Sequence, residues 1–172
     1  AAGKRTYELQ LAAALEAANC DVVLCDSHLC ILSEELLSRF EGRLLNVHPA
    51  ITDLQSPHRL PGRTPSLDAY TRAVYGYVFV DDKLKAAGLA GLKRFEVEWD
   101  GRLRPAVSVP RSTIHGVTVH RMSTKVDEGE VLLSETFDLI HDARLQDLSV
   151  EVIRTLTYRV KVGGIVTRAL LH

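Results

Sequence analysis

Hydrophobic and polar residues follow one another along the first third of the chain in the pattern of alternating helices and strands. Apolar side chains recur at helical spacing over residues 4–18, which predicts a helix. The short, β-branched run at 21–26 predicts a buried parallel strand. Ser33, followed by two glutamates, predicts the start of a second helix that ends at residue 42, and a second strand follows at 43–48. This order at short spacing is typical of an open α/β sheet.

The remaining pattern predicts a loop, one more helix, a surface β-hairpin, two strands and two carboxyl-terminal helices. These elements lie at 49–62, 64–74, 94–109, 116–122, 131–137, 150–160 and 165–171. The hairpin is predicted because stretches of apolar–polar alternation flank Asp100 and Gly101, a pair that favours a tight turn. We therefore predict one domain over residues 1–172, with an insertion at about 77–111.

The composition is that of an ordinary globular domain. Hydrophobic residues make up 46% of the 172 residues and charged residues 25%, which is close to the average of soluble proteins. Basic and acidic residues number 21 and 22, so the net charge of −1 gives no electrostatic sign of a nucleic-acid or membrane partner. No apolar run approaches the ~20 residues that a transmembrane helix needs.

The three cysteines, Cys20, Cys25 and Cys30, predict free thiols. An odd number of cysteines without a secretion signal is typical of a reducing compartment, so we predict a cytoplasmic protein. Zinc sites use close pairs of cysteines, which this spacing lacks, and no fourth ligand has matching spacing. The pattern therefore favours cysteines that pack as small hydrophobic side chains, and it predicts no metal site.

Candidate chemistry lies at the carboxyl end of the second predicted strand, where Asn46 and His48 stand two positions apart. Residues two apart in a strand project from the same face, and ligands of open α/β sheets bind outside the carboxyl ends of the strands. An amide can stabilise the oxyanion that forms in acyl transfer, and an imidazole can move a proton near neutral pH. The pair is what acyl transfer to an amine requires, although an isolated histidine can equally be a buried or solvent-facing structural group.

A second constellation comprises His115–His120 and the segment 125–129 that follows it. Asp127 in that segment comes just after a predicted strand, so it could meet His48 in space and orient it. The alternative interpretation is a plain turn, because aspartate and glycine are common turn residues.

Both constellations resemble motifs of the 10-formyltetrahydrofolate-dependent formyltransferases. The matching stretches are Ile31–Ser33 with Gly42–Pro49, and His115–His120 with Val126–Gly129. The resemblance implies a Rossmann-like formyltransferase fold with a mostly parallel sheet. It also implies that Asn46 holds the formyl oxygen, that His48 handles the proton, and that Asp127 orients His48 and orders a water that relays the proton.

The same resemblance implies 10-formyltetrahydrofolate as the cosubstrate, no metal, and a small-molecule amine or hydroxylamine as the formyl acceptor. The residues that would bind the cosubstrate lie in or beside the two motifs: His28, Leu29, Cys30, Ile31, Leu32 and Val126. The segment Leu60–Ser66 is more similar to members that formylate hydroxyornithine in siderophore synthesis, or sugar and aminoacyl amines, than to the purine enzymes that use glycinamide ribonucleotide. Nearby Arg59 and Arg63 could bind a carboxylate or phosphate of the acceptor.

The chain departs from the family pattern in two places. Cys30 stands where the family often has an arginine, and no strand and Gly-rich turn precede the first helix. We therefore expect the carboxyl-terminal portion of a formyltransferase, with the amino-terminal half of the sheet missing.

Two other interpretations stay open. One is a non-catalytic folate-binding fragment or pseudoenzyme of the same family. The other is an unrelated α/β domain whose motifs match by chance, which a separation of Asp127 from His48 beyond roughly 8 Å would favour. The pattern does not indicate an oligomeric state.

Overall fold

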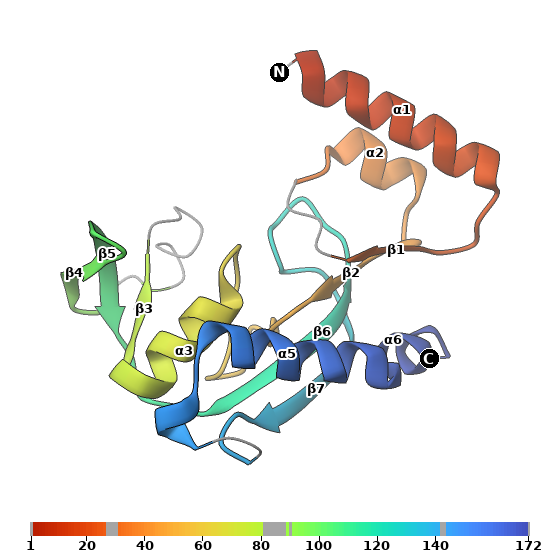
Figure 1. Ribbon diagram of the computed structural model, residues 1–172. Helices are drawn as coiled ribbons and strands as arrows, with labels where there is room; N and C mark the ends of the chain where they lie inside the picture. Colours follow the sequence, from red (N-terminus) through yellow and green to blue (C-terminus); the bar gives the residue numbers. More distant parts are fainter. Residues whose placement is uncertain (1, 27–30, 81–88, 90, 142–143, 172) are drawn as a thin grey trace.

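A four-stranded sheet in the order β1-β2-β6-β7 lies at the centre of the fold (Figure 1). The computed structural model describes residues 2–26, 31–80, 89, 91–141 and 144–171. The strands of this sheet are β1 (Val23–Asp26), β2 (Leu44–His48), β6 (Ile114–Arg121) and β7 (Val131–Asp138). The helices α1 (Ala2–Ala18) and α2 (Glu34–Arg39) lie on one side of the sheet. On the other side lie α5 (Val150–Val160), the π-helical turn η2 (Lys161–Ile165) and α6 (Val166–Leu170).

The directions of the strands confirm the α/β class but correct the expected mostly parallel sheet to a mixed one. β1 and β2 are parallel, whereas β2 and β6, and β6 and β7, are antiparallel. The link between β6 and β7 runs only from Arg121 to Val131. It is shorter than the helical crossover that parallel neighbours need, so these two strands pair as a hairpin.

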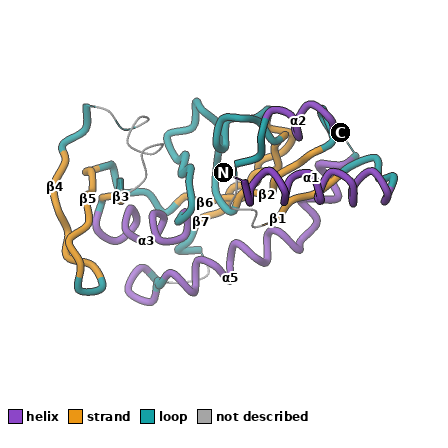
Figure 2. The backbone as a smooth tube through the Cα atoms, turned by 90° about the horizontal axis from the view of Figure 1, so that it is seen from above, coloured by secondary structure: helices purple, strands orange, loops and turns teal. Residues whose placement is uncertain are grey.

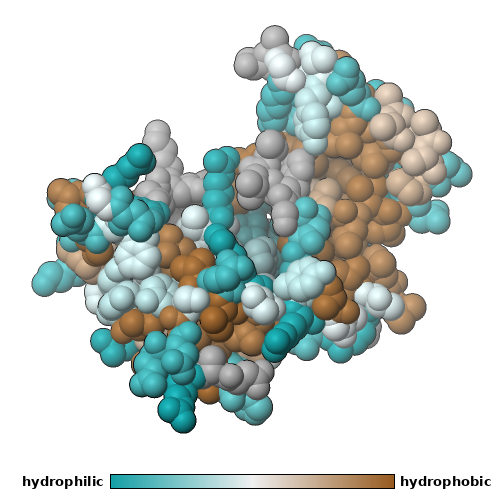
Figure 3. All heavy atoms as spheres, in the orientation of Figure 1, coloured by the Kyte–Doolittle hydropathy of each residue, from teal (hydrophilic) through white to brown (hydrophobic). Residues whose placement is uncertain are grey.

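β1 also differs from the buried strand that its β-branched sequence predicts. It is one of the two edge strands of this sheet among the described residues, and its side chains alternate between half-buried and exposed. Figure 3 shows apolar side chains gathered around this edge, where Val22 and Leu24 are exposed. Apolar character alone could not distinguish a central strand from an edge strand, because burial depends on what lies beside it.

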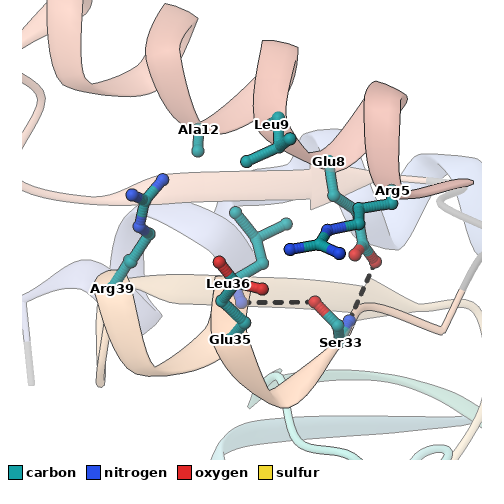
Figure 4. A pocket seen from close by; sticks show the side chains of 8 residues that line it. All are labelled: Arg5, Glu8, Leu9, Ala12, Ser33, Glu35, Leu36 and Arg39. Atoms are coloured by element: carbon teal, nitrogen blue, oxygen red, sulfur yellow. Dashed lines mark hydrogen bonds between the residues drawn. The ribbon is translucent and has the colours of Figure 1, made fainter.

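The helices α1 and α2 are joined by a capping interaction at Ser33 (Figure 4). The Leu36 N–H donates to Ser33 Oγ at 3.3 Å, and the Ser33 N–H donates to Glu8 Oε1 at 2.9 Å. The N-cap predicted at Ser33 is therefore confirmed, and Glu8 of α1 satisfies a further backbone donor at this helix end. Apolar side chains fill the space between the two helices and the sheet: Ala12, Leu32, Leu36, Phe40 and Leu44.

A second sheet of three antiparallel strands lies beside the first, in the order β3-β5-β4 (Figures 1 and 2). Its strands are β3 (Tyr77–Phe79), β4 (Arg94–Trp99) and β5 (Arg102–Ser108). The predicted hairpin is confirmed, and its turn residues Asp100 and Gly101 have positive φ angles of 51° and 70°, as such a two-residue turn requires. The hairpin is not purely a surface element, because β3 extends it and Val107 of β5 is fully buried.

The largest core cluster holds the two sheets together. The helix α3 (Pro65–Tyr75) and the 3-10 turn η1 (Leu145–Asp147) complete the fold. Apolar side chains of α3, β3, β5 and α5 meet in this cluster, together with Ala50 and Leu60 from the loop between β2 and α3. That loop is therefore fixed at both ends by core residues, and it lies against the carboxyl end of β2.

The described cysteines, Cys20 and Cys25, are half-buried free thiols, as predicted, and Cys30 lies outside the described residues. In the part of the chain that the structure describes, no helix combines the length and the apolar character needed to cross a membrane.

Candidate active site

One face of β2 and β6 is polar although it is buried. Asn46 pairs with His120 across the two strands, and His48 pairs with Thr118, so the four side chains share one face of the sheet. All four are buried. The residues between and beside them project from the opposite face into the core under η2 and α6: Leu45, Val47, Val117 and Val119. The sheet therefore presents a polar patch on one side and hydrophobic packing on the other.

Asp127 enters this patch from the connection between β6 and β7. Its Oδ1 atom lies 3.3 Å from Nδ1 of His48, and its Oδ2 atom accepts a hydrogen bond from the Gly62 N–H at 2.8 Å. The backbone of Asp127 has a φ of 54°, a left-handed conformation that is uncommon for residues other than glycine. Such conformations persist where the surroundings enforce them, here through contacts of both carboxylate oxygens.

His48 is held at both ring nitrogens. Its Nε2–H donates to the Leu60 carbonyl at 3.1 Å, while Nδ1 faces the Asp127 carboxylate. Burial lowers the pKa of His48 below the ordinary value of 6.5, whereas the negative charge of Asp127 and the Leu60 carbonyl act in the opposite direction. The arrangement gives a neutral imidazole a place to accept a proton and a carboxylate to stabilise the charge that results.

The amide of Asn46 is held by a second histidine. Asn46 Nδ2 lies 3.2 Å from Nε2 of His120, and Nδ1 of His120 lies 2.9 Å from the Arg121 carbonyl. His120 Nε2 is also 3.8 Å from Asp127 Oδ1, so the carboxylate lies between two imidazoles. An amide, a histidine and a carboxylate thus converge from β2, β6 and the loop after β6.

The loop between β2 and α3 is fixed to this centre by a buried arginine of α3. Arg72 donates from Nη1 to the His58 carbonyl at 3.1 Å, and from Nη2 to the Ile114 carbonyl. Burial lowers the pKa of Arg72 to about 10, and the negative charge of Asp68 acts against this shift. Because Arg72 binds both the loop and β6, it sets the distance between the two segments that supply partners for His48.

Arg59 of the same loop lies at the margin of the patch. Its Nε atom donates to the Thr52 carbonyl at 3.1 Å, and its guanidinium lies 3.7 Å from the Glu128 carboxylate. The side chain is mostly buried, with 18% exposed. Arg63 is exposed. Of the two arginines considered for an acceptor anion, Arg59 is the one held near His48, whose pKa its positive charge lowers.

Comparison with models of protein families gives one match, over the amino-terminal part of the chain. Residues 1–54 match the model of the family described as formyl transferase. This match covers less than a third of the 172 residues. No curated protein sequence matches the chain.

Three solved structures show how far the formyltransferase fold extends along the chain. PvdF of pyoverdin biosynthesis, an N10-formyltetrahydrofolate-dependent formyltransferase, is 24% identical with a TM-score of 0.69, over 99% of this chain and 57% of that one. Phosphoribosylglycinamide formyltransferase from Bacillus halodurans is 18% identical with a TM-score of 0.54, and the match covers 92% of this chain and 56% of that one. A formyltetrahydrofolate deformylase from Pseudomonas syringae pv. tomato is 15% identical with a TM-score of 0.59, and the match covers 94% of this chain and 38% of that one. The chain thus spans little more than half the length of the first two structures.

The wide separation of Asp127 from His48 that would favour chance matches in an unrelated domain is not observed. The fold is that of formyltransferases, and Asp127 lies within 3.3 Å of His48. The structure brings together Asn46, His48 and Asp127, the three residues predicted as catalytic.

The structure describes only three of the six residues predicted to bind the cosubstrate. His28, Leu29 and Cys30 lie outside the described residues. Ile31 is 47% exposed and Val126 is half-buried, so both have surface to offer a ligand. Leu32 is 3% exposed and packs between α1 and α2, so only its backbone could contact a ligand. These assignments remain predictions.

Sequence reasoning missed three groups that hold the site: the His120 ring, the Leu60 carbonyl and the Gly62 N–H. A signal for His120 exists, because Asn46-Val-His48 and Thr118-Val-His120 share a polar–Val–polar pattern that two paired strands would align. The two backbone groups have no such signal, since any residue supplies them. Among the described residues, no cluster of three or more histidine, cysteine or acidic side chains could hold a metal ion.

Proposed function

We propose that this chain carries the catalytic centre of a formyltransferase that moves a formyl group from 10-formyltetrahydrofolate to an amine or hydroxylamine nitrogen. The observation that supports this most directly is the contact of His48 with Asp127 beside the amide of Asn46, all three buried on one patch. Two of the similar structures are named as formyltransferases, and one of these as dependent on N10-formyltetrahydrofolate.

The residues of the patch fit a formyl donor. When bound, the folate cosubstrate supplies an electrophilic formyl carbon. The Asn46 amide can donate to the formyl oxygen and stabilise negative charge that develops on it. His48, once neutral, can take the proton that the attacking nitrogen loses, and Asp127 stabilises the imidazolium and keeps its ring in place.

The acceptor that we propose is a small amine or hydroxylamine, with hydroxyornithine and glycinamide ribonucleotide as the two candidates. The resemblance of the segment Leu60–Ser66 to hydroxyornithine-formylating members favours the first. Leu60 and Gly62 of this segment bind His48 and Asp127 directly, so the loop that would meet the acceptor also positions the proton-transfer pair.

A non-catalytic folate-binding role is the second candidate. It is supported by Cys30, which stands where the family often has an arginine.

The test is formyl transfer by the purified chain with 10-formyltetrahydrofolate and each of the two acceptors, followed by mass spectrometry of the product. His48→Ala is expected to lower turnover by at least ~100-fold, the range of general acid–base catalysis. His141→Ala, which alters an exposed histidine after β7, is the matched control and should leave turnover unchanged. Equal turnover in wild type and His48→Ala contradicts the role of His48. Calorimetric binding of a folate analogue without any transfer by wild type would favour the non-catalytic role.

A further inference from the structure

The proposed reaction assigns no role to the buried ring of His120. It is 3% exposed, it stands opposite Asn46 in the β2–β6 register, and it contacts both Asn46 and Asp127. Because it lies beside two of the three catalytic side chains, its hydrogen-bonding state bears on both.

The hydrogen bonds of His120 determine which nitrogen carries the proton. A carbonyl oxygen only accepts, so the 2.9 Å contact with the Arg121 carbonyl requires a hydrogen on Nδ1. Nε2 of the neutral ring is then an acceptor, and it faces the Nδ2 amide of Asn46 at 3.2 Å. The Asn46 N–H therefore donates to His120.

This bond fixes the orientation of the Asn46 amide. An amide turned by 180° would place its Oδ1 atom against the lone pair of His120 Nε2, which is repulsive. The NH₂ group carries two hydrogens, of which His120 uses one. The second hydrogen is free to donate a hydrogen bond to a formyl oxygen. If the Asn46 amide could rotate, its Oδ1 atom would face the formyl oxygen for part of the time.

When His120 is neutral, it makes no hydrogen bond to Asp127, so the carboxylate remains available to His48. The His120 Nε2 atom is 3.8 Å from Asp127 Oδ1, beyond hydrogen-bond distance, whereas His48 Nδ1 is at 3.3 Å. A ring with a hydrogen on Nε2 would donate to the carboxylate that His48 needs once its Nδ1 is protonated, and it would expel the Asn46 amide. One hydrogen-bonding state of His120 is thus compatible with the arrangement of all three catalytic residues.

The backbone around His120 is shaped to hold this state. The pairing of β6 with β7 is irregular between Val119 and His120, and such irregularities re-aim side chains next to functional sites. A Cβ atom at Gly129 would lie 1.7 Å from the Arg121 carbonyl oxygen and 3.3 Å from His120 Nδ1. Only glycine lets the loop that carries Asp127 pack against the Arg121 carbonyl, which accepts the hydrogen bond from His120 Nδ1.

We propose that His120 is a positioning residue of this site. In its neutral, Nδ1-protonated form it orients the Asn46 amide toward the formyl oxygen and keeps Asp127 available to His48. The inference rests on the formyl transfer proposed above, but the hydrogen-bonding state of His120 can be measured without any turnover.

Two variants separate positioning from packing. In His120→Asn the shorter side chain can still donate to the Arg121 carbonyl but does not reach Asn46. In His120→Gln the longer side chain can place an amide oxygen where Nε2 lies, so the Asn46 N–H keeps its acceptor.

We expect kcat to fall roughly tenfold to 100-fold in His120→Asn, as for a small misplacement of a catalytic group, while KM for the folate cosubstrate is unchanged. His120→Gln should retain kcat within about threefold of wild type. Equal losses of kcat in the two variants, with equal urea midpoints, would overturn the proposal.

A measurement on the wild-type chain gives an independent answer. Long-range ¹H–¹⁵N spectra should show the Nδ1–H form of His120, and the Asn46 side-chain amide, identified by its loss in Asn46→Asp, should exchange slowly with solvent. In His120→Asn that exchange should accelerate. An Nε2–H form of His120 in wild type refutes the inference even if the variants do not fold. If the spectra are as expected but the wild-type chain transfers no formyl group, then the proposed function fails while the orientation of Asn46 stands.

Discussion

His115 makes the folded chain sensitive to acid. Its ring is fully buried at the start of β6 and packs against Phe137, with ring centroids 5.6 Å apart. Burial lowers the pKa of His115 to about 3, and the positive charges of Arg72 and protonated His48 add to the effect. In the unfolded chain the same group has a pKa of about 6.5. Between these two values only the unfolded state binds the proton.

The magnitude follows from this difference in pKa. A histidine that protonates only after unfolding stabilises the unfolded state by RT ln(1 + 10^(6.5 − pH)), which is about 0.1 kcal/mol at pH 7.5 and about 2 kcal/mol at pH 5. The contribution of His115 to stability is therefore intact above pH 6.5 and is lost progressively as the pH falls. We expect His115 alone to lower the free energy of unfolding by about 2 kcal/mol between pH 7.5 and pH 5.

The assay is urea unfolding at pH 7.5 and pH 5.0 of wild type, His115→Leu and His115→Gln. Neither replacement titrates in this range, so each variant should lose about 2 kcal/mol less than wild type on acidification, whatever its stability at pH 7.5. His141→Ala removes an exposed histidine, and it serves as the control that should lose as much as wild type. If wild type and both His115 variants lose the same free energy on acidification, then His115 is not held neutral by the fold, and the reasoning is refuted.

Further predictions concern the loop after β6, the cap of α2 and the His48–Asp127 pair. Gly129→Ala should lower the free energy of unfolding by about 1–3 kcal/mol, because the new methyl group meets a backbone carbonyl of β6; Gly163→Ala, where a Cβ would meet open space, should not lower it. Ser33→Ala should cost about 1 kcal/mol in thermal unfolding through loss of the N-cap, and an unchanged Tm would contradict that role. Asp127→Asn should shift the NMR titration midpoint of His48 to lower pH, because the carboxylate raises that pKa; an unchanged midpoint would show that the charge of Asp127 does not reach His48.

Much of the fold follows from signals within a few residues of one another. Ser33 caps α2, proline stands at the start of α3, and the Asp100–Gly101 turn closes the β4–β5 hairpin, all as the sequence predicts. The motif residues Asn46 and His48 are likewise placed by strand alternation, which depends only on local backbone geometry. The polar patch could thus be anticipated in part.

Local signals along the chain are enough to predict the α/β class, most elements and the residue types of the site. The antiparallel pairing of β2 with β6, and the groups that surround Asn46, His48 and Asp127, are visible only in the folded structure. Asn46 meets His120 across 74 positions of the chain, and Asp127 meets Gly62 across 65. Such contacts leave no periodic trace in the sequence, because they depend on how two distant segments pack rather than on their own backbone preferences.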